Sequence, residues 1–151
     1  MPKPPGRPIP PAKQALLALL RTADRVKGRL AATIEPHGVT AQQFNVLRIL
    51  RGAEPEGLPT LTVATRMLER APGITRMLDR LERQELVARE RRAGDRRCVH
   101  VRISRKGLDL LEGLDRPVDA ADRAAFSALD ARELAQLTAL LEKVRRAHEP
   151  R

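Results

Sequence analysis

Apolar residues recur at intervals of three and four over most of the chain, which is the pattern of helices with one buried face. The first stripe covers about 12–34 and is ended by the Pro-His-Gly segment at 36–38. Thr40 and Gln43 then have the spacing of a capping box. The pattern predicts a second helix that begins after Thr40 and ends near Gly52.

Two short helices are predicted next, over about 60–68 and 72–85. Pro72 suits a first-turn position of the second helix, because its missing N–H would be unpaired there. The expected inner faces carry Leu61, Ala64, Met67 and Leu68 in the first helix, and Ile74, Met77 or Leu78, and Leu81 in the second.

A hairpin is predicted from Leu86 onward, with strands at 86–91 and 97–103 around the turn at 93–95, and its second strand alternates with a period of two. One face of the second strand carries Val99, Val101 and Ile103, and the other carries Cys98, His100 and Arg102. Two short helices followed by a hairpin are typical of a winged helix-turn-helix.

Two further helices follow the hairpin. Ser104 is the expected N-cap of the first, which Pro117 should kink or interrupt. Asp130 and Glu133 form another capping box before the last helix. The outer helices have long apolar stripes, which could fold back on the core. We expect instead that the first and last helices pair with those of a second copy, because a two-fold protein matches two DNA half-sites.

The predicted fold class is therefore mainly α with a small β-hairpin wing, a winged helix-turn-helix core flanked by N- and C-terminal dimerisation helices. The expected division is a flexible, basic, Pro-rich arm at 1–11, an N-terminal dimerisation helix at 12–35, a DNA-binding domain at 36–103, C-terminal dimerisation helices at 104–147 and a tail at 148–151.

Charge points to an anionic partner. The net charge is +10, from 29 Lys and Arg against 19 Asp and Glu. Residues 66–107 hold 13 basic and 6 acidic side chains, a concentration that a general bias towards arginine would not produce. Such a distribution is typical of nucleic-acid binding. Aromatic residues make up 1% of the chain, which disfavours base stacking on aromatic side chains.

Other classes of function find little support. Cys98 is the one cysteine, so no intramolecular disulfide forms, and the three histidines lack zinc-site spacing. No nucleophile–base pair or Gly-rich phosphate loop suggests an enzyme or a cofactor. With no apolar run of about 18 residues and no secretory signal, we expect a cytoplasmic protein without a membrane partner.

The helix that begins at about Pro72 is the candidate for the helix that contacts the bases. Pro72 and Gly73 lack bulk, which lets its N-terminus approach a phosphate or a base edge. Arg76 can reach guanine O6 and N7 with a bidentate fork, and Thr75 can touch a base or a phosphate. Arg80 lies farther from the tip and suits a backbone contact. The alternative is an amphipathic helix with a solvated charged face.

The hairpin tip is the more specific signal, because residues 87–107 hold 8 basic and 2 acidic side chains. Gly94 and Asp95 make a tight turn, and Arg96 and Arg97 follow at once. A narrow minor groove attracts an inserted arginine. We expect Asp95 to orient the Arg97 guanidinium and Arg96 to hold a phosphate. The alternative is a tip that is basic for solubility.

These residues resemble the MarR family of bacterial transcription regulators over about 12–145. The resemblance rests on the segments Thr40-Ala41-Gln42-Gln43-Phe44-Asn45-Val46-Leu47, Ile74-Thr75-Arg76-Met77-Leu78-Asp79-Arg80-Leu81-Glu82, Asp95-Arg96-Arg97 and Ile103-Ser104-Arg105-Lys106-Gly107. It implies a homodimer on a pseudo-palindromic operator of double-stranded DNA, with the recognition helix in the major groove and Arg97, oriented by Asp95, in the minor groove. Many members are repressors released by a small, often phenolic or anionic, effector held between the dimer helices and the DNA-binding lobe.

The effector site stays unassigned from the sequence, because the chain lacks the aromatics that would mark a ligand pocket. His37 is interpreted as an exposed loop histidine and Cys98 as a passive thiol. Two alternative functions are a non-specific basic nucleic-acid-binding protein and a winged-helix module that binds protein. The first would be expected to have lysine-rich tails or stacking aromatics, and the second would be expected to lack arginines on the second short helix and at the wing.

Overall fold

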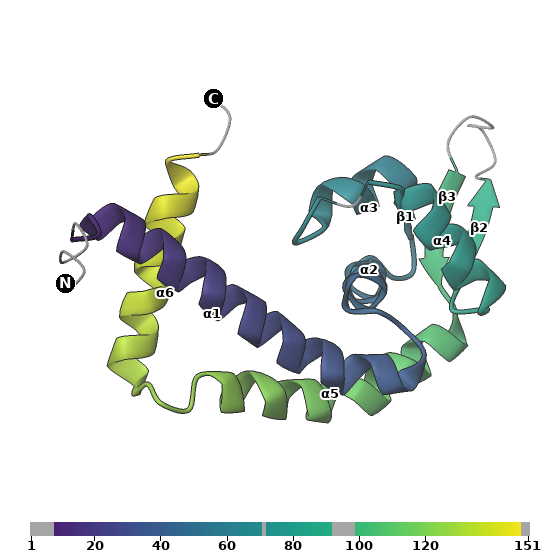
Figure 1. Cartoon of the computed structure of the whole chain (residues 1–151). Helices are drawn as coiled ribbons and strands as arrows, with labels where there is room; N and C mark the ends of the chain where they lie inside the picture. Colours follow the sequence, from purple (N-terminus) through teal and green to yellow (C-terminus); the bar gives the residue numbers. More distant parts are fainter. Residues whose placement is uncertain (1–7, 71, 92–98, 149–151) are drawn as a thin grey trace, which may run out of the picture.

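The computed structural model describes residues 8–70, 72–91 and 99–148, which form a small winged lobe and a long helical arm (Figure 1). The helices are α1 (Pro11–Ile34), the short 3-10 turn η1 (Glu35–His37), α2 (Ala41–Arg51), α3 (Thr60–Arg66), α4 (Ile74–Arg83), α5 (Arg105–Ala125) and α6 (Ala131–Arg146). The strands are β1 (Leu58–Pro59), β2 (Val87–Arg91) and β3 (Val99–Ile103).

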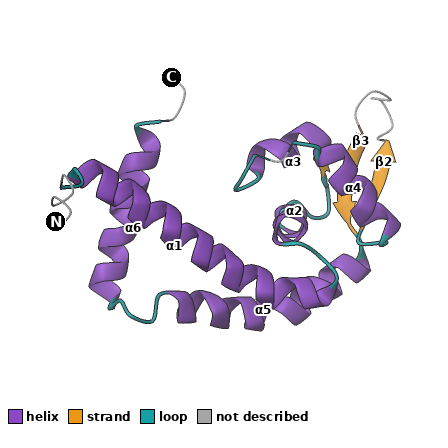
Figure 2. Cartoon of the chain, viewed as in Figure 1, coloured by secondary structure: helices purple, strands orange, loops and turns teal. Residues whose placement is uncertain are grey.

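The arm consists of α1 and α5, which pack against each other, and of α6, which follows at the end away from the lobe (Figure 1). The lobe holds α2, α3, α4 and the sheet, drawn in orange in Figure 2. One core joins the lobe to the adjoining parts of α1 and α5. Its largest fully buried side chains are Ile34, Val46, Leu47, Leu50, Val63, Leu78, Leu81, Val101, Leu111 and Leu114.

The predicted caps are confirmed. The backbone N–H of Gln43 donates to Thr40 Oγ1 at 3.2 Å, and the Gln43 side chain accepts from the Thr40 N–H at 2.9 Å. Asp130 and Glu133 make the same reciprocal pair before α6. Ser104 Oγ accepts from the Gly107 N–H at 3.0 Å and starts α5. These caps satisfy N–H groups that a helix leaves unpaired in its first turn.

The sheet contains one strand more than the hairpin predicted from the sequence. The short β1 pairs with β3 through Leu58 and Val101, which places β3 in the centre. Gly57 makes this pairing possible. Its φ is +65°, and a Cβ there would lie 2.5 Å from the Val101 carbonyl oxygen. β1 escaped prediction because two residues cannot display an alternating pattern.

The structure corrects two expectations about the helices: the end and inner face of α3, and an interruption at Pro117, which was one of the two effects expected there. α3 ends at Arg66 rather than near 68, because the extended backbone of Met67 turns the chain away and leaves Leu68 86% exposed. Leu61, which was also expected on the inner face, is 79% exposed, because Val63 is the residue of α3 that fills the core. Pro117 does not interrupt α5, which is continuous across it. Burial of Leu114 and Val118 on both sides of Pro117 outweighs the hydrogen bond that the proline cannot donate.

The predicted mainly helical, winged helix-turn-helix fold is confirmed. In the described ranges, no helix has the length and apolar character needed to cross a bilayer. Within those same ranges, no group of three or more histidine, cysteine, aspartate or glutamate side chains could hold a metal ion.

Candidate nucleic-acid interface

The start of α4 is set by Gly73 rather than by Pro72. Gly73 is the N-cap residue and has a left-handed φ of 88°, so the helix begins at Ile74. The expected first-turn position of Pro72 was therefore wrong, since Pro72 precedes the helix. A positive φ interrupts helical backbone geometry and is cheap only for glycine. Within the described residues no side chain caps this helix end, and both Pro72 and Gly73 are exposed, so its N-terminal N–H groups face outward.

The outer face of α4 carries the residues predicted to read DNA. Leu78 and Leu81 are buried and hold the helix on the core. Thr75, Arg76 and Arg80 are exposed, as their spacing around the helix predicted. Their side chains therefore project from α4 into the solvent, where a ligand as large as a DNA duplex can reach them.

An arginine on the wing, Arg89 of β2, holds the acidic groups of α4. Its Nη1 lies 2.7 Å from Asp79 Oδ1 and 3.3 Å from Glu82 Oε2, and its Nη2 donates to the Thr75 carbonyl oxygen at 3.3 Å. The Arg89 side chain is only 24% exposed. In the sequence Arg89 is one of the 13 basic residues of the segment 66–107, and no local signal pairs it with a helix that precedes it.

This cluster changes the charge that α4 presents. The carboxylates of Asp79 and Glu82 are paired with Arg89, so they are neutralised from the side of the wing. Among the described residues no ion pair is formed by Arg76 or Arg80. The exposed face of α4 is thus electropositive despite the acidic residues in its sequence.

A shallow groove of about 270 Å³ lies between the N-terminal part of α2 and the first turns of α4. It is lined by Thr40, Gln42, Gln43, Pro72, Gly73, Arg76, Met77 and Arg80. The segments that flank these helices are also joined, since Gln84, which follows α4, donates from Nε2 to the carbonyl oxygen of Gly38, which precedes α2, at 2.9 Å. The groove therefore joins four of the predicted DNA-binding residues, two before α4 and two on it, to a neighbouring polar surface.

The wing is described up to its tip. Val87 of β2 pairs with Ile103 of β3, and the ladder continues to Arg91 and Val99, with Val101 and Ile103 in the core as predicted. Across it, Arg102 Nη1 donates to Glu90 Oε2 at 3.4 Å. The predicted tip residues Asp95, Arg96 and Arg97, and Cys98 beside them, lie outside the described residues.

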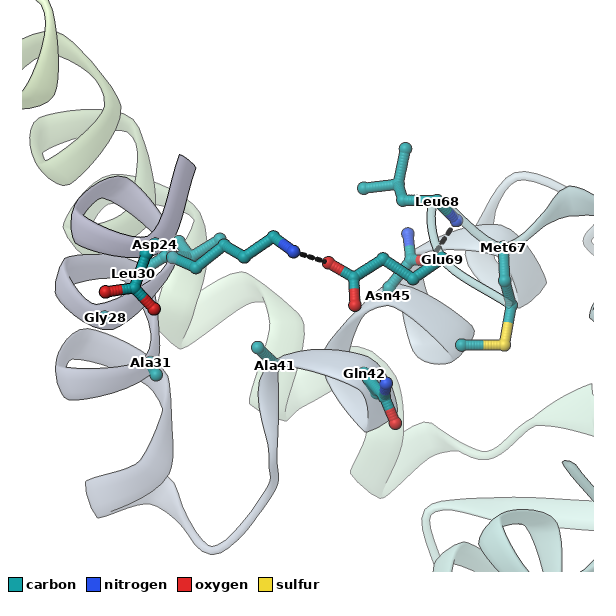
Figure 3. Close-up of a pocket in the computed structure, with 11 residues that line it drawn as sticks. Asp24, Gly28, Leu30, Ala31, Ala41, Gln42, Asn45, Met67, Leu68 and Glu69 are labelled. Atoms are coloured by element: carbon teal, nitrogen blue, oxygen red, sulfur yellow. Dashed lines mark hydrogen bonds and ion pairs between the residues drawn. The ribbon is translucent and has the colours of Figure 1, made fainter. Parts of the chain in front are cut away.

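A second hollow lies on the other side of α2, where α1, α2 and the end of α3 meet (Figure 3). Its volume is about 570 Å³, and its lining is Asp24, Lys27, Gly28, Leu30, Ala31, Ala41, Gln42, Asn45, Met67, Leu68 and Glu69. This cavity was not predicted from the sequence, because its walls come from three separate elements and combine small and aliphatic residues with polar ones. His37 is exposed and does not line it.

Two polar contacts organise this cavity. Lys27 Nζ forms an ion pair with a carboxylate oxygen of Glu69, and the Leu68 N–H donates to Asn45 Oδ1 at 3.1 Å; both appear as dashed lines in Figure 3. The first contact joins α1 to the segment between α3 and α4. The cavity is therefore bounded both by the arm and by the chain that leads into α4.

Comparison with known protein families finds a match that falls mainly on this lobe. The model of the MarR family matches residues 39–99, which include all of α2, α3, α4 and β2. The crystal structure of a MarR transcription factor from Planctomyces limnophilus is 40% identical, with a TM-score of 0.70 and coverage of 90% of this chain and 98% of that one.

Two further relatives carry functional descriptions. A mutant MarR from Escherichia coli, solved in complex with operator DNA, is 27% identical, with a TM-score of 0.77 and coverage of 84% of this chain and 90% of that one. The homoprotocatechuate degradative operon repressor of Escherichia coli is 28% identical over 127 residues, which is 84% of either chain. The similarity thus extends beyond the lobe into the arm.

Proposed function

The chain belongs to the MarR family of transcriptional regulators, which confirms the resemblance noted in its sequence, and from this premise we propose that it is a homodimeric, ligand-responsive repressor. Each subunit applies α4 to the major groove of one half-site of a pseudo-palindromic operator. Repression is the role of the Escherichia coli relative that acts on the homoprotocatechuate degradative operon.

The single observation that carries this proposal is the outer face of α4. Arg76 and Arg80 are exposed, and the neighbouring carboxylates of Asp79 and Glu82 are held by Arg89. A helix that only needs a solvated surface gains nothing from keeping its cations free and its anions paired. A helix that approaches phosphates gains from both, because unpaired carboxylates would repel the DNA.

Each predicted DNA-binding residue then has a role. Arg76 makes the bidentate contact to guanine, and Thr75 contacts a base or a phosphate. Pro72 and Gly73 allow the uncapped N-terminus of α4 to lie close to the DNA, and Arg80 contacts the backbone. At the wing tip, Arg97 enters the minor groove, Asp95 orients it and Arg96 holds a phosphate.

The dimer is proposed from two apolar faces at the end of the arm away from the lobe. None of the described residues of α6 is buried, although this helix has an apolar stripe. The exposed large apolar residues of the two helices are Leu16, Leu19 and Leu20 on α1 and Leu134, Leu140, Leu141 and Val144 on α6. Exposed apolar surface of this extent is typical of an interface, and a second copy offers the matching surface.

The effector is proposed to occupy the 570 Å³ cavity between α1, α2 and the end of α3. Its aliphatic walls suit the apolar body of a small molecule, and an acidic group on that molecule would replace Glu69 as the partner of Lys27. An occupant would contact Leu68 and Glu69, which lie in the segment before α4. Binding there would shift α4 and weaken its contact with DNA.

The experiment that tests this function is selection of bound sites from random duplex DNA. A dimeric repressor should enrich two inverted half-sites about one helical turn apart, since each lobe meets the same groove once per turn. Enrichment without a shared motif would indicate a non-specific nucleic-acid-binding protein. No retention of duplex DNA at moderate salt would favour a protein-interaction module, and either result would reject the proposal.

A further inference from the structure

An ion pair connects the winged lobe to the arm. Arg51, the last residue of α2, donates from Nη1 and Nη2 to the two carboxylate oxygens of Asp115 on α5, at 2.8 and 3.0 Å. Both side chains are partly buried. A two-point contact between a planar guanidinium and a planar carboxylate sets direction as well as distance. It is therefore a stricter constraint than the single-point ion pairs on the surface of this chain.

The position of the pair along α5 lets it restrain the direction of this helix relative to the lobe. The start of α5 is already attached to the lobe, because Ser104 Oγ donates to the Glu85 carbonyl oxygen at 2.6 Å and Lys106 Nζ donates to that of Gln84 at 2.9 Å. Asp115 lies about 16 Å farther along the helix axis at 1.5 Å per residue. Two attachment points this far apart define the direction of α5 relative to the lobe.

The other contacts between the lobe and α5 restrain this direction less. They are made by buried aliphatic side chains such as Leu50, Leu111 and Leu114. Apolar contact is non-directional, so it resists separation of α5 from the lobe more than it resists a small rotation. Beyond Val118 none of the described residues of α5 is buried. The pair thus acts near the end of the attached part of the helix.

We propose that Arg51 is a positioning residue, which with Asp115 sets the angle of the winged lobe on the arm and thereby the spacing of half-sites that the dimer accepts. This inference rests on the proposed function for its consequence on DNA. Successive base pairs are about 3.4 Å apart, so a displacement of a few ångströms at each α4 changes the preferred spacing.

The angle itself is tested without DNA. Spin labels are placed on the full chain through Ala88→Cys on β2 and Ala124→Cys on α5, both exposed, in a Cys98→Ser background and diluted with unlabelled chains. The distance distribution should be narrow in the parent. It should broaden in Arg51→Ala and in Asp115→Ala, and become narrow again when Arg51→Asp is combined with Asp115→Arg.

A matched control is Arg105→Ala, which removes an arginine whose ion pair with Asp109 stays within α5. Its distribution should remain narrow. An unchanged distribution in both single variants at Arg51 and Asp115 would overturn the proposal. So would failure of the reversed pair to restore the narrow distribution in a folded protein, because the effect would then not depend on the ion pair.

The spacing is tested on duplexes whose half-sites, defined by selection with the parent protein, are moved apart or together by one base pair. The parent should bind the duplex with its selected spacing at least tenfold more tightly than the two duplexes with altered spacing. In each single variant this ratio of affinities should fall below threefold. The reversed pair should restore the ratio seen in the parent. A mere loss of stability would weaken binding to all spacings equally and would overturn the spacing role. If the parent selects no duplex, the proposed function fails, while the label distances still decide the role of the pair.

Discussion

At the scale of single residues, the partner of an arginine decides its role more than its place in a basic segment. Arg76, Arg80 and Arg89 all belong to the segment 66–107, in which basic residues outnumber acidic ones. In the structure Arg89 forms ion pairs with two carboxylates of α4, whereas Arg76 and Arg80 project outward. Exposure around the helix could be predicted from its period, but the partner of Arg89 could not, because it comes from another element.

Arg76 is expected to determine base preference. Replacing it by alanine removes a bidentate contact, so Arg76→Ala should relax the preference at one position per half-site at a cost of about 1–3 kcal/mol. Site selection repeated with the variant measures this effect. Arg80→Ala is the matched control and should weaken binding about equally for all sequences. Recovery of an unchanged motif with Arg76→Ala would exclude the contact.

Arg89 is expected to act by neutralising α4 rather than by touching DNA. Arg89→Ala frees the carboxylates of Asp79 and Glu82 beside the phosphates, so operator affinity should fall. Adding Asp79→Asn to this variant should recover part of the loss, because one repelling charge disappears. Titrations of fluorescent operator DNA measure both effects. Arg105→Ala controls for the lost positive charge, and a double variant that binds no better than Arg89→Ala would argue against repulsion.

At the scale of elements, the features predicted best from the sequence are those that depend only on residues close together in the chain. The caps at Thr40, Ser104 and Asp130 were confirmed because each cap and its partner lie three residues apart. The start of α4 was misplaced because it depends on the backbone angle of Gly73, which the residue type permits but does not require. The end of α3 was misplaced for a similar reason at Met67.

The start of α4 leads to a prediction with opposite signs at two glycines. Gly73→Ala forces a side chain into a φ of 88°, so it should destabilise the fold by about 1 kcal/mol and disturb the tip of α4. Gly113→Ala places the same methyl group in open space within the helix α5 and should stabilise by up to about 1 kcal/mol. Urea unfolding at one protein concentration measures both. Equal effects of the two substitutions would contradict the role of the backbone angle.

At the scale of the whole molecule, the pattern predicts apolar stripes but not what covers them. The stripes of α2, α4 and the first half of α5 enter one core, whereas α6 and the first half of α1 remain exposed. These segments look alike in sequence, because coverage depends on how the elements are arranged around one another. The 570 Å³ cavity was not predicted from the sequence for the same reason, since its walls come from α1, α2 and the end of α3.

The uncovered faces yield a prediction for the assembly. Leu20→Glu on α1 and Leu141→Glu on α6 each place a charge where a second copy should bury an apolar side chain, which costs about 1.5–3 kcal/mol of lost burial alone. Each should raise the dissociation constant of the dimer at least tenfold in sedimentation equilibrium. Leu61→Glu on α3 is the control, because Leu61 is more exposed than either but lies on the lobe.

The control separates an interface from general surface hydrophobicity. If α1 and α6 form the dimer, Leu61→Glu should leave its dissociation constant unchanged, whereas association through any exposed leucine would weaken in all three variants. Loss of the dimer should also convert operator binding from a single step into two weaker steps, one per half-site, because the linkage between the two lobes is removed. A parent chain that sediments as a monomer at micromolar concentration would contradict the assembly and, with it, the expected two-fold operator.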